Sequence, residues 1–196
     1  MKIRNTKNEI RNRQSGFTVL ESIVAIFVLS LSISGVFSAI QRSLSQSIIS
    51  RDEVRAFYLA QEAVELVRNK RDINYLTRIV NGSSVSWLDG ITTGAGSCPV
   101  GNVCRIDANV ALANSIVNCG SVWDSCPENL RQDSSGASPT YKYGHNAGWN
   151  VTNFKREIKF EAINADEIAM IVQITWTKGA IITKQFKIRT HLLNWL

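Results

Sequence analysis

The stretch GFTVLESIVAIFVLSLSISGVFSAI, residues 16–40, decides the fold, because it is apolar, lacks proline and contains a single charged residue, Glu21. At a rise of about 1.5 Å per residue, a helix over residues 17–40 is long enough to cross a bilayer. Residues 1–16 carry five Lys or Arg and one Glu. Basic residues beside an apolar helix hold that side in the cytoplasm. We therefore expect a membrane helix with its N-terminus inside and the chain after residue 41 outside.

Three interpretations of this stretch compete. The first is a plain signal-anchor helix. The second is a secretory signal peptide cut near residues 36–39, although residues 17–40 exceed the usual apolar length of about 7–15 residues and carry a carboxylate near their start. The third is cleavage between Gly16 and Phe17, which keeps the helix on the mature chain.

The third interpretation rests on a resemblance to the processing site of type IV prepilins and pseudopilins. A basic leader is followed by Gly16, by Phe17, by Glu21 as the fifth residue after the cut, and by a long uncharged run. The resemblance implies that a prepilin peptidase removes residues 1–16 and that Phe17 becomes the methylated N-terminus. It also implies that Glu21 pairs with the N-terminal ammonium of a neighbouring subunit during assembly.

The same resemblance implies partners and a location. The partners would be the prepilin peptidase, other pilins or pseudopilins, and the inner-membrane platform of an assembly machinery. The chain would be a single-pass protein of the cytoplasmic membrane before assembly, and part of an extracytoplasmic filament or the cell surface afterwards. The implied function is that of a structural subunit, a minor pilin or pseudopilin, in a type IV pilus or a related secretion filament.

Residues 41–76 are predicted to continue the helix as an amphipathic segment. Gly35 is the only glycine between residues 17 and 81, and the first proline is Pro99. The helix-bending proline that many filament-forming pilins carry in the apolar half is absent from this sequence. One stripe is expected to pack on a sheet or a partner helix, and it consists of Ala56, Leu59, Ala63, Leu66 and Ile73.

Residues 77–150 are predicted to be a variable loop region, rich in Gly, Ser, Asn and Asp. Only short strand or helix candidates are expected here, for example at residues 103–106 and 110–116. All four cysteines lie here, and outside the cytoplasm disulfides can persist. Four cysteines allow three pairings. We favour the local bridges Cys98–Cys104 and Cys119–Cys126, because short loops close easily.

Residues 151–196 have the clearest strand pattern. Strands are expected at residues 154–163, 168–177 and 180–191, with a turn at Lys178-Gly179. Short connections favour an antiparallel meander whose apolar face covers the helix. The predicted fold class is therefore α+β and pilin-like. Residues expected on the apolar faces are Phe154, Ile158, Phe160, Ala162, Trp176, Ile182, Phe186 and Ile188.

Other functions receive less support from the sequence. The net charge is +6, of which +4 belongs to residues 1–16, so nucleic-acid binding by the rest of the chain is not expected. His145 and His191 belong to no recognisable triad, acid pair or metal motif, so we expect no enzyme, no cofactor and no metal. The alternative function is an adhesin or DNA-uptake pilin that binds an external ligand through the loop region. Its candidate exposed aromatics are Trp87, Trp123 and Trp149, while residues 190–195, which end in Trp195, resemble the last strand of some pilin-like proteins.

Overall fold

The computed structural model describes residues 16–134, 138–178 and 182–194. One helix, α1 (Val19–Asn81), spans 63 residues. It begins at Val19 rather than at residue 17, and it ends at Asn81 rather than at residue 76. The later end has a local cause: Gly82 adopts a φ of 60°, and a glycine in this left-handed conformation commonly ends a helix.

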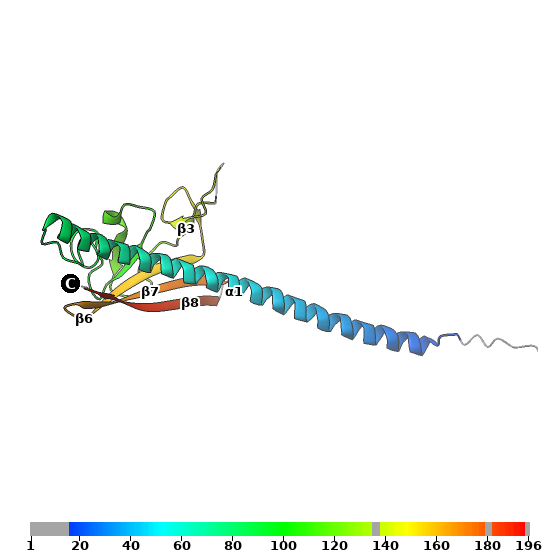
Figure 1. The fold of residues 1–196 in the computed structure, drawn as a ribbon. Helices are drawn as coiled ribbons and strands as arrows, with labels where there is room; N and C mark the ends of the chain where they lie inside the picture. The colour runs from blue at the N-terminus through cyan, green and yellow to red at the C-terminus, as the bar shows by residue number, and fades with distance from the viewer. Residues whose placement is uncertain (1–15, 135–137, 179–181, 195–196) are drawn as a thin grey trace, which may run out of the picture. The chain divides into compact units, whose positions relative to one another are not determined.

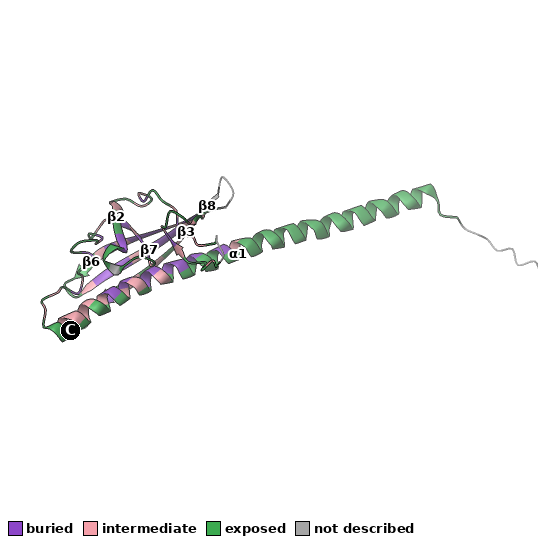
Figure 2. Cartoon of the chain, turned by 90° about the horizontal axis from the view of Figure 1, so that it is seen from above, coloured by how far each residue is buried: buried purple, intermediate pink, exposed green. Residues whose placement is uncertain are grey.

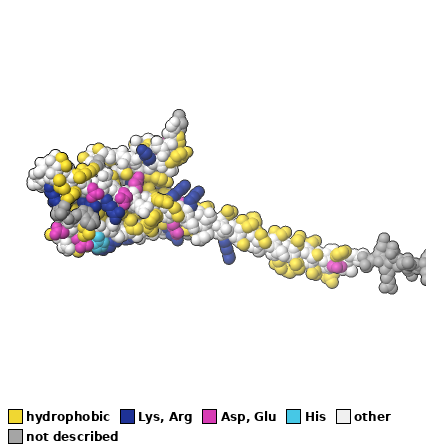
Figure 3. Space-filling model, viewed as in Figure 1, with side chains coloured by type: hydrophobic (Ala, Val, Ile, Leu, Met, Phe, Trp, Pro, Cys, Tyr) yellow, Lys and Arg dark blue, Asp and Glu magenta, His cyan; other side chains and the backbone are white. Residues whose placement is uncertain are grey.

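The chain divides into two compact units, residues 1–49 and residues 50–196. In the first unit, residues 19–48 of α1 are exposed along their whole length (Figure 2), and hydrophobic side chains cover them (Figure 3). Among the described residues, α1 is the one helix long and apolar enough to cross a membrane.

Three serines of this apolar half bond their hydroxyls within the helix. Ser30 donates to the carbonyl of Ile26 at 2.8 Å, and Ser32 donates to the carbonyl of Val28 at 2.9 Å. Ser38 makes the same bond one turn back, to Ser34 at 2.9 Å. These bonds satisfy the hydroxyls inside the helix, so the serines are compatible with an apolar surrounding.

The second unit contains a five-stranded sheet with the order β2-β1-β6-β7-β8. The strands are β1 (Val103–Ile106), β2 (Ile116–Gly120), β6 (Phe154–Asn164), β7 (Glu167–Lys178) and β8 (Ile182–Leu193), and all pairings are antiparallel (Figure 1). The predicted meander is confirmed as β6, β7 and β8.

The loop region adds more regular structure than the sequence suggested. The candidate at residues 103–106 is β1, but the candidate at 110–116 is a connection containing the 3₁₀ helix η1 (Leu112–Asn114), with β2 starting at Ile116. A second sheet has the order β4-β3-β5 and consists of β3 (Arg131–Gln132), β4 (Tyr143–Gly144) and β5 (Asn150–Val151).

The second half of α1 packs on the five-stranded sheet (Figure 1). Three buried alanines on this face allow the helix to approach the strands closely, and larger side chains from the strands fill the space between them. Phe154 and Trp176 are opposite each other in register, with ring centroids 6.0 Å apart. The helix side of the core consists of Ala56, Leu59, Ala60, Ala63, Val64 and Val67.

Three expectations about burial are wrong. Ile73 is 41% exposed, because the stripe facing the sheet continues through Val67 and Lys70 to Asn74, whose amide donates to the carbonyls of Trp87 and Asp89. Ala162 is exposed beside the register shift at the end of β6. Trp87 is buried against the core.

Candidate functional site

The segment between the predicted leader and α1 is exposed and lies outside regular structure. Gly16, Phe17 and Thr18 precede the first helical residue, and all three are exposed. The Phe17 side chain is 79% exposed, and a Cβ placed on Gly16 would meet no atom within 4 Å. The predicted cleavage site therefore lies in accessible chain outside regular structure, where another protein can reach the backbone.

The first turn of α1 is capped by Thr18. The backbone amide of Glu21 donates to Thr18 Oγ1 at 3.3 Å. Thr18 and Glu21 match the Thr-x-x-Glu capping pattern, a signal that our sequence reasoning missed. The cap places Glu21 in the first turn, where the positive end of the helix dipole favours a carboxylate.

One comparison with known families bears on this segment. A family model described as the prokaryotic N-terminal methylation motif matches residues 11–37. This motif is the class III signal peptide of type IV pilins, and the match spans Gly16, Phe17, Glu21 and most of the apolar half of α1. Residues 11–37 therefore carry the N-terminal methylation motif of type IV pilins, and the long helix α1 fits this motif. No curated protein and no solved structure matches the chain.

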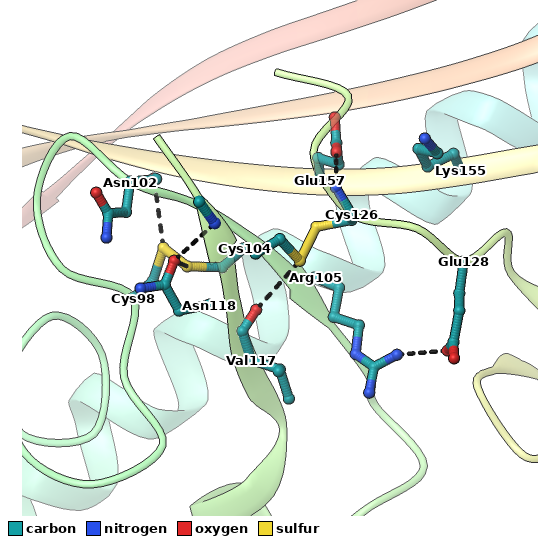
Figure 4. The surroundings of a disulfide bond; sticks show 12 residues. Cys98, Asn102, Cys104, Arg105, Val117, Asn118, Cys126, Glu128, Lys155 and Glu157 are labelled. Carbon is teal, nitrogen blue, oxygen red and sulfur yellow. Dashed lines mark hydrogen bonds and ion pairs between the residues drawn. A yellow bond between two sulfur atoms is a disulfide. The ribbon is translucent and has the colours of Figure 1, made fainter. Parts of the chain in front are cut away.

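Both predicted local disulfides are present in the structure. Cys98–Cys104 ties the loop after α1 to β1, and both of its residues are buried (Figure 4). Cys119–Cys126 ties β2 to the loop that follows it. Each bridge closes a short loop against the sheet, so the irregular region is anchored at two separate points.

Changing Cys119 and Cys126 to serine together is expected to lower the free energy of unfolding by about 2–3 kcal/mol, because the unfolded chain regains the freedom of the closed loop. Urea unfolding of the full chain in detergent, without reductant, measures this. The paired Cys98 and Cys104 variant should lose more stability, since it also removes two core residues. Equal unfolding midpoints for wild type and both variants would contradict this prediction.

A buried arginine joins the helix to the sheet. Arg156 lies on the core face of β6, and its side chain is fully buried. Its guanidinium donates to the carbonyl of Leu59 at 3.1 Å, to the carbonyl of Ile106 at 2.9 Å and to the carboxylate of Glu62. One side chain therefore links α1, β1 and β6. The sequence signal for this contact is a charged residue on the same strand face as Phe154 and Ile158.

The neighbouring Glu157 lies on the opposite face of β6 and is also buried. Its two carboxylate oxygens accept the backbone amides of Asp124 at 2.8 Å and Cys126 at 3.0 Å (Figure 4). Glu157 therefore fixes the loop that the Cys119–Cys126 bridge closes.

A polar cavity lies between the β1–β2 connection and the loop between β4 and β5. Its volume is about 400 Å³, and its walls include Asp107, Asn114, His145 and Trp149. The cavity is therefore made by two segments of the predicted variable region.

Asp107 is the acidic residue of this wall. Burial alone would raise its pKa. The His145 ring, whose Nδ1 lies 3.5 Å from Oδ2, and hydrogen bonds from the backbone amides of Asn109 and His145 outweigh burial and hold the pKa of Asp107 well below its usual value. The carboxylate is therefore ionised at neutral pH.

The remaining candidates fall in different places. His191 lies on the exposed face of β8, with Nδ1 2.6 Å from Glu167 Oε1, and is separate from His145. Trp176 is in the core, as expected, while Trp149 lines the cavity. Trp123 lies under the ammonium of Lys187, 4.9 Å from the ring centroid. Trp195 lies outside the described residues.

Proposed function

We propose that this chain is a minor subunit, a minor pilin or pseudopilin, of a type IV filament. The observation that carries the proposal is the methylation motif at residues 11–37, placed on an exposed junction at the start of a long apolar helix. Prepilin peptidase cuts after Gly16, and Phe17 becomes the methylated N-terminus. The globular residues 50–196 then remain attached to one hydrophobic helix.

The proposed orientation places the leader in the cytoplasm and the globular unit outside. The net charge of +4 on residues 1–16 supports this direction through the preference of basic residues for the cytoplasmic side. The two disulfides support it independently, since disulfides persist in oxidising compartments.

Glu21 is the proposed assembly residue. It is the only charge between residues 17 and 41, on a helix whose other large side chains in this range are apolar. A carboxylate within a bilayer or a bundle of apolar helices is costly, by about 2.5–3.5 kcal/mol at the centre on insertion scales. An ammonium at residue 17 of a neighbouring subunit relieves this cost, so correct stacking is favoured over incorrect stacking.

The experiment has two readouts in the native cells. N-terminal sequencing of the membrane form should start at residue 17, and deletion of the peptidase should leave the start at Met1. The Glu21→Leu variant should still be cut, but its amount in purified filaments should fall at least about tenfold, a change that corresponds to about 1.4 kcal/mol.

The matched control is Glu53→Leu, which changes an exposed glutamate on the same helix within residues 50–196. It should enter filaments at the wild-type level. A start at Met1 in cells with active peptidase would exclude processing, and wild-type incorporation of Glu21→Leu would exclude the proposed pairing.

A further inference from the structure

The cavity beside Trp149 has the construction of a ligand site. We call it the Trp149 cavity; its wall residues used below are Asp107, Asn109, Asn114, His145, Asn146 and Trp149. Its volume of about 400 Å³ lies within the usual range for small-molecule pockets. All of its walls belong to residues 50–196, so the site requires neither the leader nor the apolar helix.

The wall is held in place by several hydrogen bonds. Asp107 Oδ1 accepts the backbone amide of Asn109 at 2.8 Å, and Oδ2 accepts that of His145 at 2.8 Å. The Asn109 side chain donates to the Tyr143 carbonyl, which joins the two segments that make the cavity. These bonds fix the polar groups before any ligand arrives.

Gly144 allows this close approach. A Cβ at this position would lie 2.8 Å from Asn109 Nδ2, 2.9 Å from Asp107 Oδ1 and 3.1 Å from the Trp149 ring. A larger residue would therefore push the carboxylate, the amide and the indole apart. The backbone of β4 at Gly144 therefore lies close to all three of these side chains.

His145 supplies a buried polar group that the described protein does not satisfy. Its side chain is 7% exposed, and Nδ1 lies 3.5 Å from Asp107 Oδ2. Nε2 is shielded from solvent and has no hydrogen-bond partner among the described residues. A buried polar atom without a partner is unfavourable, and no described residue relieves this cost at Nε2.

The charges on the wall exclude most ligand classes. The ionised Asp107 repels phosphates and carboxylates, and the guanidinium of Arg105 is already paired with Glu128 (Figure 4). No group of three or more His, Cys, Asp or Glu in the described part of the chain could hold a metal ion. Arg105 lines the same cavity and disfavours an organic cation, so the expected ligand is neutral and carries groups that both donate and accept hydrogen bonds.

A sugar ring has this chemistry. Its hydroxyls can donate to Asp107 and accept from the amides of Asn114 and Asn146, while its weakly positive C–H face can lie on the negative face of the Trp149 indole. We propose that the Trp149 cavity binds a terminal monosaccharide of a neutral glycan.

Saturation-transfer NMR on the full chain, in a zwitterionic detergent without sugar groups, tests this proposal. The probes are the free sugars and the methyl glycosides of glucose, galactose, mannose, fucose, N-acetylglucosamine and N-acetylgalactosamine. At least one glycoside should receive saturation from the protein. Binding of the methyl glycoside as well as the free sugar indicates a glycan end, because the methyl group occupies the position where a longer chain continues.

Three variants test whether the sugar binds in the Trp149 cavity. Trp149→Ala and Asn114→Ala should each weaken binding, Trp149→Ala at least about tenfold, because the first removes the stacking surface and the second removes a hydrogen-bond donor. Trp123→Ala is the matched control and should bind normally, because Trp123 lies against Lys187 and not in the cavity. Circular dichroism checks that each variant keeps its fold, and Asn114, whose side chain is exposed, is the variant least able to disturb it.

Three outcomes would overturn the proposal. One is the absence of saturation transfer to every glycoside at millimolar concentration. Another is binding that survives in both Trp149→Ala and Asn114→Ala while Trp123→Ala behaves as wild type. The third is selective binding of only the free sugar, which would reject the glycan end while leaving the filament role of the chain untouched.

Discussion

Replacing Arg156 with alanine is expected to lower the free energy of unfolding by about 3–5 kcal/mol, the usual cost of breaking a buried charged contact. The substitution removes bonds to the carbonyls of Leu59 and Ile106 and leaves Glu62 without its guanidinium partner. It also empties a space in the core, since the Arg156 side chain is fully buried. The loss therefore combines unpaired polar groups with a cavity.

The matched control for Arg156 is Arg189→Ala on β8. Arg189 forms an ion pair with Glu161 at 2.9 Å, but its side chain is 51% exposed. An exposed pair contributes about 0–1 kcal/mol, so this variant should unfold close to wild type. Urea unfolding of the full chain in detergent, followed by tryptophan fluorescence, compares the two. If both variants lowered the free energy of unfolding by similar amounts, the contacts of Arg156 between helix and sheet would add no more stability than an exposed ion pair.

Glu157→Ala is expected to cost about 2–3 kcal/mol and to loosen one loop in particular. The substitution leaves the amides of Asp124 and Cys126 without their carboxylate acceptor. Hydrogen bonds to a charged group contribute about 1.5–3 kcal/mol, and buried donors without a partner are unfavourable. Hydrogen exchange at these two amides should accelerate before exchange at the strand amides changes.

The control for Glu157 is Glu161→Ala on the same strand, because Glu161 is the other member of the exposed pair with Arg189. Its removal should leave exchange at Asp124 and Cys126 unchanged. Unaltered protection of those amides in Glu157→Ala would mean that the Cys119–Cys126 bridge holds the loop without the carboxylate.

The large elements of the fold could be predicted because their signals are local and repeated. The apolar run, the amphipathic stripe and the alternating strands each extend over many residues, so errors at single positions did not change the prediction. The details depended on tertiary contacts. Ile73 fits the apolar stripe by spacing, but the helix turns Lys70 and Asn74 toward the loop instead. The pairing of β1 with β6 joins residues distant in sequence, and no hydrophobic periodicity in the sequence predicts which strands pair.

The predicted cleavage segment could be recognised from the sequence because its residues are consecutive, and the family match lies on the same residues. The cavity could not be recognised from the sequence. Asp107 directly follows β1 and His145 directly follows β4, so these two residues, which are distant in sequence, meet only in the folded chain. No sequence pattern around His145 indicates the carboxylate beside it.

The internal bonds of Ser30, Ser32 and Ser38 have a consequence for how this helix moves between surroundings. Since each hydroxyl already has a carbonyl acceptor one turn back, leaving lipid for a bundle of protein helices breaks no hydrogen bond at these positions. In the proposed assembly, shape and the carboxylate of Glu21 would then govern this exchange. Ser30, Ser32 and Ser38 would add no hydrogen-bond cost when the helix leaves the membrane.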